Sequence, residues 1–504
     1  MTTLVRGASP TLVRDALTVL QPGFTGTTAP DWLLRRIGEG LSSVGLFGRN
    51  IASTGQLDAL TARLRAERDD VLVAIDEEGG DVTRLEVRTG SSFPGNLALG
   101  TVDDTGLTRA VAAELGRRLA ACGVDFNWAP SADVNSDPAN PVIGVRSFGA
   151  DPHLAARHTV AYIEGLQSVG VAACTKHFPG HGDTNVDSHL AMPRIDADLA
   201  TLHARELVPF RAAIAAGAKS VMSAHILLPA LDPDRPATLS PRILTGLLRR
   251  ELGYEGLIVT DGMEMRAIAS TYGIERGSVL ALAAGADAIC VGGGLADEGI
   301  VLRLRDALVD AVRTGELPEE RLADAAARVR ALASWTRAHR AGGAGAVPGA
   351  ASEEGTAPGT GIGLVAARRA LRLTGSREPL TAPAHVAAFT PATNIAVGDE
   401  TPWGVGPELA RLLPGTTSGT YASDAAVERV LRDAGERRIV AVVRDVHRHP
   451  WMAGALDGLL AARPDTVVVE MGVNQAPARG ALHIATHGAA RVCGIAAAEV
   501  VAGA

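Results

Sequence analysis

The chain has 504 residues, of which 46% are hydrophobic and 21% are charged. This length and composition exclude a disordered polymer and predict two domains, each with a sizeable core. The net charge of -8 argues against nucleic acid or anionic membrane surfaces as partners. No run of 18 apolar residues predicts a transmembrane helix.

Targeting and redox features favour the cytoplasm. The first 24 residues lack a basic start, an unbroken apolar stretch and a small-residue cleavage site, so no signal peptide is predicted. The four cysteines are widely scattered and match no zinc spacing; they are Cys122, Cys174, Cys290 and Cys493. Lone thiols in a chain of this length fit a reducing compartment.

Eight short β-rich runs alternate with helical segments over the first 340 residues. The strand candidates are 16–20, 43–47, 71–75, 124–128, 170–174, 219–223, 256–260 and 286–291. Stretches with helical periodicity lie between most of them, at 107–121, 153–168, 199–216 and 241–252. This alternation predicts an α/β protein with a closed parallel (β/α)₈ barrel; an open, doubly wound sheet is the alternative.

The remainder of the chain predicts a linker and a second domain. A helix at 319–340 is followed by a Gly-, Ala- and Pro-rich stretch at 341–361, which has no periodic apolar face. Residues 362–504 then alternate again, with strands in HVAAFTP, RIVAVVRDV and TVVVEMG and a closing helix in ATHGAARVCGIAAAEVVA. We therefore predict a barrel domain over 1–340, a linker over 341–361 and a smaller three-layer α/β domain over 362–504.

Polar residues cluster after five of the predicted barrel strands, where such barrels carry their reactive groups. The third, fourth and fifth strands are followed by IDEEGGDVTR, NWAPSADVNSDPANPVIGVRSFG and TKHFPGHGDTNVDSH, and the sixth and seventh lead into SAH and TDGMEM. The side chains concerned are Asp76, Arg84, Arg146, Lys176, His177, His189, His225 and Asp261. Any one of them could be a surface charge or an ion pair, but together on one barrel face they predict an active site.

These segments resemble the β-N-acetylhexosaminidase branch of glycoside hydrolase family 3. The resemblance is carried by IDEEGGDVTR, NPVIGVRSFG, KHFPGHGDTNVDSH and VTDGMEM, and it spans essentially the whole barrel, with LQPGF, LFGRN and PATLSP in the expected order. It implies a retaining hydrolase that cleaves terminal β-linked N-acetylhexosamine through a covalent glycosyl–enzyme intermediate, with no metal and no cofactor.

The resemblance also assigns roles to individual residues. It makes Asp261 the nucleophile, His189 the general acid/base and Asp187 the partner of His189. It implies sugar-binding roles for five more residues: Asp76, Arg84, Arg146, Lys176 and His177. Because every matched segment lies before residue 270, we expect residues 362–504 to supply no catalytic residue.

Elementary chemistry supports these assignments. Retention needs a carboxylate on one face of C1 and a proton donor near the leaving oxygen, and a strand end can position Asp261 accurately. An imidazole can be the donor because its unperturbed pKa lies close to working pH. Asp187, two residues earlier, can orient one ring nitrogen of His189 if the segment forms a turn. We expect Glu264 to be a solvent-side or helix-terminal charge.

Other interpretations remain open. The clustered His177, His181 and His189, with Asp183 and Asp187, could instead bind a metal, and Arg84 and Arg146 could form structural ion pairs. Alternative functions are a β-N-acetylglucosaminide phosphorylase, a β-glucosidase or xylosidase of the same family, and a non-catalytic sugar-binding protein. The sequence identifies neither the aglycone nor the oligomeric state.

Overall fold

A computed structural model describes residues 7–184, 186, 192–341, 361–390, 400–422 and 426–504, and these residues form two compact units. The first unit takes its residues from Met1–Glu77, Thr108–Val134 and Ala150–Ala350. The second takes them from Glu78–Leu107, Asn135–Gly149 and Ala351–Ala504. Two segments from the early part of the chain therefore belong to the second unit, so the two units do not simply follow one another along the sequence. Most of the expected linker, 342–360, lies outside the described residues.

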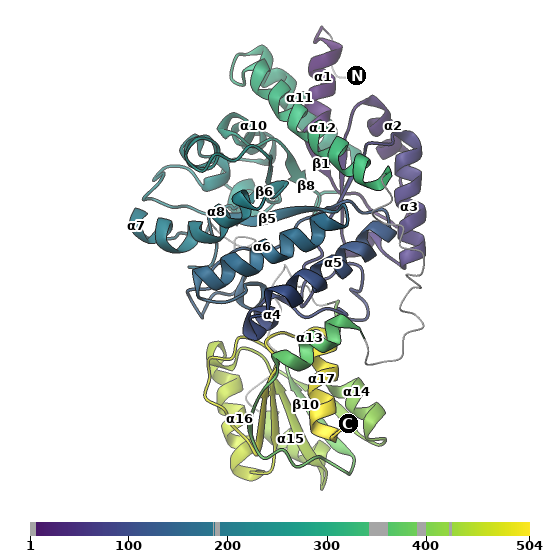
Figure 1. The fold of residues 1–504 in the computed structure, drawn as a ribbon, viewed down its shortest axis with the longest axis vertical. Coiled ribbons are helices and arrows are strands. Elements are labelled where there is room, and N and C mark those ends of the chain that lie inside the picture. Colours follow the sequence, from purple (N-terminus) through teal and green to yellow (C-terminus); the bar gives the residue numbers. More distant parts are fainter. Residues whose placement is uncertain (1–6, 185, 187–191, 342–360, 391–399, 423–425) are drawn as a thin grey trace. The chain divides into compact units, whose positions relative to one another are not determined.

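The first unit is built on a curled parallel sheet (Figure 1). Its strands are β1 Leu20–Pro22, β2 Ser43–Leu46, β3 Leu72–Ile75, β4 Phe126–Asn127, β5 Ala172–Phe178, β6 Ser220–Ser223, β7 Leu257–Thr260 and β8 Ile289–Val291. Strands β2 to β7 pair in chain order, and β1 pairs with β8. A parallel bridge between Val259 and Ala288 joins β7 to the residue before β8. This topology confirms the predicted barrel-like α/β fold.

One predicted strand is wrong. Residues 16–18 end helix α1 (Pro10–Thr18), and the first strand begins only at Leu20. The Ser9 hydroxyl accepts a hydrogen bond from the Leu12 backbone at 3.0 Å, and Pro10 occupies the first helical position. Both features start a helix. A short apolar run such as ALTVL fits a buried helix as well as it fits a strand.

Helices cover the parallel sheet of the first unit, which explains why its strands are buried along their whole length. The α-helices are α1, α2 Asp31–Glu39, α3 Thr54–Glu67, α5 Thr105–Ala121, α6 Pro152–Ser168, α7 Leu199–Thr201, α8 Leu207–Ala215, α9 Arg266–Ala269, α10 Ile274–Ala284, α11 Glu298–Arg313 and α12 Glu319–Ala341. Two π-helical segments, η3 Leu202–Glu206 and η5 Arg242–Glu251, lie within the helical stretches predicted at 199–216 and 241–252. The helices predicted at 107–121, 153–168 and 319–340 are confirmed.

The second unit contains a six-stranded sheet in the order β11-β10-β12-β13-β14-β9, in which only β9 is antiparallel to its neighbour. The strands are β9 Arg372–Gly375, β10 Ala384–Phe389, β11 Thr417–Tyr421, β12 Arg438–Val443, β13 Val467–Glu470 and β14 Leu482–Ala485. The helices are α4 Asn96–Val102, α13 Ile362–Ala370, α14 Gly406–Leu412, α15 Ala426–Ala434, α16 Pro450–Ala462 and α17 Arg491–Ala502. Figure 1 shows α4, which comes early in the chain, beside α13.

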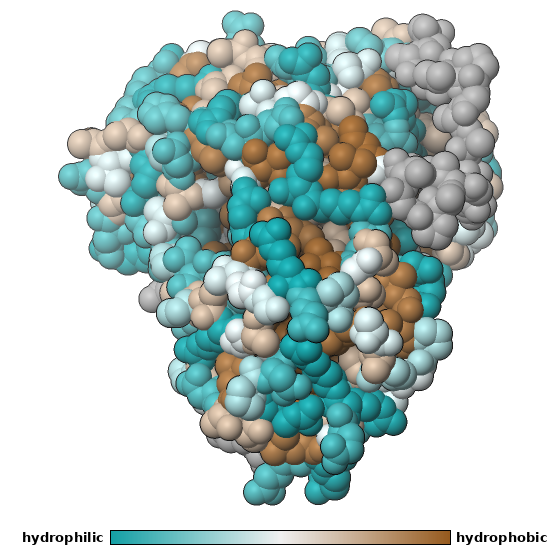
Figure 2. Space-filling model, turned by 60° about the horizontal axis from the view of Figure 1, so that its bottom comes forward, coloured by the Kyte–Doolittle hydropathy of each residue, from teal (hydrophilic) through white to brown (hydrophobic). Residues whose placement is uncertain are grey.

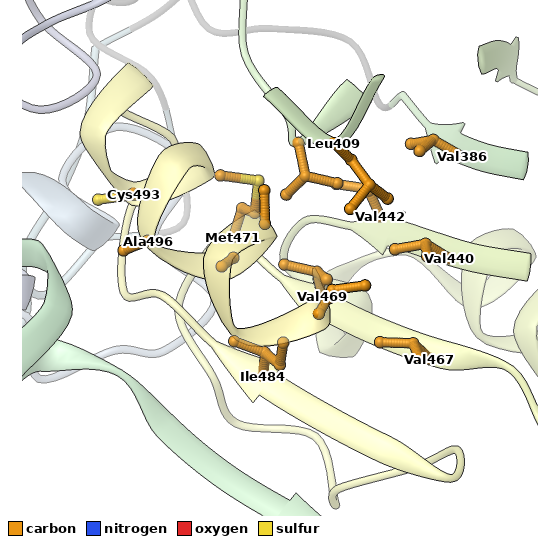
Figure 3. Packing of buried hydrophobic residues seen from close by; sticks show 14 of the residues in the cluster. Val386, Leu409, Val440, Val442, Val467, Val469, Met471, Ile484, Cys493 and Ala496 are labelled. Carbon is orange, nitrogen blue, oxygen red and sulfur yellow. The ribbon is translucent and has the colours of Figure 1, made fainter. Parts of the chain in front are cut away.

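Side-chain alternation along β12 gives this sheet two hydrophobic faces. Val440 and Val442 belong to one core with Val469, Ile484 and helix α17 (Figure 3). The intervening residues of β12 belong to a second core beneath α15 and α16. Helices on both faces of the sheet confirm the predicted three-layer arrangement of the second domain.

The surface is mixed in character. On the face shown in Figure 2, hydrophilic residues are interspersed with hydrophobic ones. Among the described residues the exposed large hydrophobic side chains are Leu199 and Val365. No helix in the described part of the chain is long and apolar enough to span a bilayer.

Candidate active site

The ends of β3 and β5 bring Asp76 and Lys176 together inside the first unit. Lys176 Nζ donates to Asp76 Oδ1 at 2.5 Å, and the lysine side chain is only 2% exposed. An ammonium group buried to this extent needs a carboxylate partner. Asn127 fixes the backbone after β3, because it accepts from the Glu77 N–H at 3.0 Å and donates to the Glu77 carbonyl at 2.7 Å. Two predicted sugar-binding residues are thus in direct contact.

A buried carboxylate, Asp133, organises the residues after β5. Its Oδ2 accepts from His177 Nδ1 at 2.7 Å and from the Ser131 hydroxyl at 2.9 Å. Its Oδ1 accepts from the backbone N–H groups of His177 at 3.1 Å and His181 at 2.7 Å. Burial opposes ionisation of Asp133, but His177 and His181 hold the pKa of that carboxyl below its usual range.

The same network sets the state of the two histidines. Because an ionised carboxylate only accepts, Nδ1 of His177 carries a proton. Burial, with the neighbouring His177, lowers the pKa of His181 to about 4, so His181 is neutral at pH 7. Sequence reasoning placed His177 in the site but missed Asp133, which lies in the polar segment after β4.

The predicted nucleophile, Asp261, follows β7 directly and is half-buried. Its backbone N–H donates to the Ser223 carbonyl at 3.2 Å, and its Oδ1 accepts from the Gly262 N–H at 2.8 Å. His225 lies beside this turn, with Nε2 3.0 Å from the Gly262 carbonyl and Nδ1 2.9 Å from the Thr238 hydroxyl. Because a carbonyl only accepts, Nε2 of His225 carries a proton. Residues at the end of β6 therefore hold the backbone turn that carries the Asp261 carboxylate.

Asp76 and Asp261 each directly follow a strand of the first unit, β3 and β7. Burial raises the pKa of the Cys174 thiol on β5 to about 12; the hydrogen bond to Ser220 and the charge of Lys176 oppose this rise, and the charges of Asp76 and Asp261 add to it. The carboxyl ends of β3, β5 and β7 converge as the barrel topology requires.

Glu264 lies near the start of α9, as expected, but its contacts are with another loop. Its Oε1 accepts from the backbone N–H of Gly292 at 2.8 Å and of Gly294 at 3.3 Å, and also from that of Gly293. Arg49 donates to the carbonyls of Gly292 and Gly293. Glu264 thus ties the loop after β7 to the residues after β8. The three glycines expose a row of backbone donors that a carboxylate can reach, which the spacing from Asp261 did not reveal.

Arg84 and Arg146 lie in the second unit. Arg146 is buried and donates two hydrogen bonds to Glu78, from Nε to Oε2 at 3.0 Å and from Nη2 to Oε1 at 2.7 Å. Its Nη1 also donates to the Val142 carbonyl at 3.2 Å. Arg84 is half-buried, and its Nη1 lies 3.4 Å from the Thr83 carbonyl. Arg146 therefore forms the ion pair that the sequence left as an alternative, and sugar binding by either arginine stays a prediction.

The predicted acid/base His189 and its partner Asp187 lie outside the described residues. Earlier in the same segment, Asp183 Oδ2 accepts from Arg205 Nη2 at 2.5 Å, and Arg205 Nε donates to Glu206 at 2.6 Å. Burial raises the pKa of Glu206 to about 7, although Arg205 opposes this. In the described part of the chain, no three His, Cys, Asp or Glu side chains are grouped to hold a metal ion.

Comparison with known proteins shows which family this chain resembles. Residues 30–332 match the glycosyl hydrolase family 3 N terminal domain. Beta-hexosaminidase A of Pseudoalteromonas piscicida is 36% identical over 312 residues, which cover 57% of this chain and 52% of that protein. Beta-hexosaminidase of Stenotrophomonas maltophilia (strain K279a) is 39% identical over 269 residues, or 52% of this chain and 78% of that protein. The chain thus spans about half the length of the first relative.

A solved structure extends the likeness to both units. The glycoside hydrolase family 3 beta-N-acetylglucosaminidase from Paenibacillus sp. str. FPU-7 superimposes with a TM-score of 0.85 at 33% identity, over 98% of this chain and 96% of that one. The match to the family domain covers more than half of the chain. The chain therefore belongs to glycosyl hydrolase family 3.

Proposed function

We propose that this chain is a retaining, exo-acting β-N-acetylglucosaminidase that hydrolyses terminal β-linked N-acetylhexosamine. The main support is Asp261, a half-buried carboxylate at the end of β7 in a family 3 chain. The names of the relatives, beta-hexosaminidase and beta-N-acetylglucosaminidase, support the substrate class.

In the proposed mechanism Asp261 attacks C1 of the sugar while His189 donates a proton to the departing glycosidic oxygen. A covalent glycosyl–aspartate forms and the aglycone leaves. His189 then removes a proton from a water molecule, whose oxygen attacks C1 and releases Asp261 with net retention. Asp187 orients the imidazole of His189.

The sugar-binding roles rest on Asp76, Lys176 and His177, together with Arg84 and Arg146. Lys176 is buried against Asp76, so its ammonium group has a fixed direction and can donate to a sugar hydroxyl without reorganising. His177 is oriented by Asp133 through Nδ1. Within the first unit, the donors and acceptors of Asp76, Lys176 and His177 suit the hydroxyl groups of a single terminal sugar ring.

All four cysteines are buried thiols, which supports the proposed cytoplasmic location.

The substrate is tested with 4-nitrophenyl β-glycosides, each assayed with and without inorganic phosphate. We expect kcat/KM for the N-acetylglucosaminide to exceed that for the glucoside by at least about 100-fold, because polar groups that pair with the acetamide are left unsatisfied by glucose. Comparable values for the two sugars would contradict the substrate assignment. Release of a sugar phosphate in place of the free sugar would identify a phosphorylase.

The chain offers a matched control for the site, because Lys176 and Lys219 are its only lysines. Lys219 lies with Nζ 5.1 Å from the centre of the Trp335 ring. Lys176→Met should lower kcat/KM by at least about 100-fold, since it leaves the Asp76 carboxylate without its buried partner. Lys219→Met should stay within about twofold of wild type.

A further inference from the structure

The carboxyl edge of the sheet in the second unit contacts two segments from earlier in the chain. Open parallel sheets bind their ligands at this edge. Here His447, in the loop after β12, donates through Nε2 to the Pro138 carbonyl at 2.8 Å. Arg491, at the start of α17, donates to the Gly90 carbonyl at 3.2 Å. The edge is therefore used to hold the chain segments 78–93 and 135–146.

Asp81 is the centre of this contact. Its side chain is 1% exposed and forms an ion pair with Arg444, which directly follows β12. Its other oxygen, Oδ1, accepts from the Ala489 N–H at 2.7 Å, in the loop after β14. Arg444 is itself mostly buried, and its guanidinium lies 6.0 Å from the centre of the Trp403 ring. One carboxylate thus joins two strand ends of the sheet, and such a buried pair contributes orientation more than net stability.

A short, tightly packed turn connects Asp81 to the Glu78–Arg146 pair. Gly79 and Gly80 have φ angles of 75° and 62°, and the Glu78 N–H donates to the Val82 carbonyl at 3.0 Å. A Cβ atom on Gly80 would lie 2.5 Å from the Gly95 Cα, so the turn packs closely against Gly95 and requires glycine. Asp81 and Glu78 are thus the two ends of one closely packed turn, and Glu78 holds Arg146.

We propose that Arg444 and Asp81 are positioning residues for substrate binding. They hold the turn at 78–81 so that Glu78 keeps Arg146 in its binding orientation and Arg84, three residues further on, keeps its place. Residues 362–504 then influence sugar binding by Arg84 and Arg146, although none of them touches the sugar. This inference rests on the proposed function of Arg84 and Arg146.

The test compares kcat and KM on 4-nitrophenyl N-acetyl-β-glucosaminide for Arg444→Met, Asp81→Asn and the double variant. We expect each single variant to raise KM about tenfold and to leave kcat within about twofold, because binding is weakened while the chemical groups stay in place. The double variant should be no worse than either single one, since both remove one interaction. Arg444→Lys, which keeps the charge, should recover part of the loss.

The control is Arg369→Ala, which breaks an ion pair with Asp104 on the surface of the same unit. It should leave KM and kcat unchanged. Hydrogen exchange of peptides that cover 78–84 should speed up in Arg444→Met and not in Arg369→Ala.

An Arg444→Met enzyme with wild-type KM overturns the inference, whether or not exchange at 78–84 changes. The inference is also overturned if kcat of Arg444→Met falls in proportion to its loss of stability and Arg444→Lys recovers neither. That result would indicate a purely structural ion pair. A wild type that turns over no N-acetylglucosaminide contradicts the proposed function instead, so the two failures are distinguishable.

Discussion

Replacement of Asp133 should destabilise the first unit by an amount that depends on how many buried donors lose their acceptor. The carboxylate accepts from the Ser131 hydroxyl, from His177 Nδ1 and from the backbone N–H groups of His177 and His181, at 2.7 to 3.1 Å. In Asp133→Asn the amide oxygen can take the place of Oδ1 and keep both backbone donors. The amide nitrogen takes the place of Oδ2 and cannot accept a hydrogen bond from His177 Nδ1.

The Ser131 hydroxyl, which also donated to Oδ2, can rotate to accept from the amide nitrogen. The asparagine variant therefore loses the one hydrogen bond from His177 Nδ1 to a charged group, worth about 1.5–3 kcal/mol. In Asp133→Ala all four donors lose this acceptor, at about 1–3 kcal/mol each. We expect losses in the free energy of unfolding of about 2 kcal/mol for asparagine and at least about 4 kcal/mol for alanine. Since the pKa of Asp133 lies below its usual value of 3.8, the stabilisation is present above about pH 4 and is lost in acid.

The assay is urea unfolding at pH 7 followed by tryptophan fluorescence, since Trp32, Trp128 and Trp335 report on the first unit. The matched control is Asp196→Ala, which breaks an exposed ion pair with Arg194 and should change stability by less than about 0.5 kcal/mol. Equal losses for the alanine and asparagine variants, or a loss below about 1 kcal/mol for alanine, would refute the reasoning.

Three further predictions concern single residues. Glu264→Ala should destabilise the first unit by about 1–3 kcal/mol in the same urea assay, since the Gly292 N–H loses its acceptor while the exposed N–H groups of Gly293 and Gly294 can bond water; Glu264→Gln should lose less. Burial lowers the pKa of His487 to about 4, so its stabilising contribution is complete above pH 6.5 and is lost, by about 3 kcal/mol, as the pH falls to 4. His487→Asn, which tolerates the left-handed backbone, should flatten the acid side of a stability–pH profile. His189→Ala should make kcat/KM depend more steeply on leaving-group pKa than in wild type; equal slopes would remove His189 as the proton donor.

The barrel was predictable because its strands are short, apolar and separated by amphipathic helices. Seven of the eight predicted strands coincide largely with observed ones, from β2 to β8, whereas the first meets β1 only at Leu20. The first failed because local capping by Ser9 and Pro10 decided between two structures that the apolar pattern of 16–20 fits equally well. In the second unit three strands, β9, β11 and β14, were not predicted. Strands β9 and β11 are mostly exposed and lack a continuous apolar run, and β14 is a buried run of four residues interrupted by His483.

The reactive side chains were more predictable than their supports. Asp76, Lys176 and Asp261 directly follow or lie within strands, so the rule for barrel strand ends located them. Asp133 and Glu264 accept hydrogen bonds from backbone N–H groups of other segments, and no spacing in the sequence predicts such a partner. The assignment of residues 78–107 and 135–149 to the second unit is likewise a matter of packing, which periodicity does not record.

The central claim is that Asp261 forms a covalent bond to the sugar, and trapping of that intermediate tests it most directly. The enzyme is incubated with a 5-fluoro N-acetylglucosaminyl fluoride, digested and mapped by mass spectrometry, with Asp261→Asn as the control. We expect one added glycosyl group on the peptide that contains Asp261, and none in the variant. An adduct on a different residue, or labelling that survives in Asp261→Asn, would contradict the account.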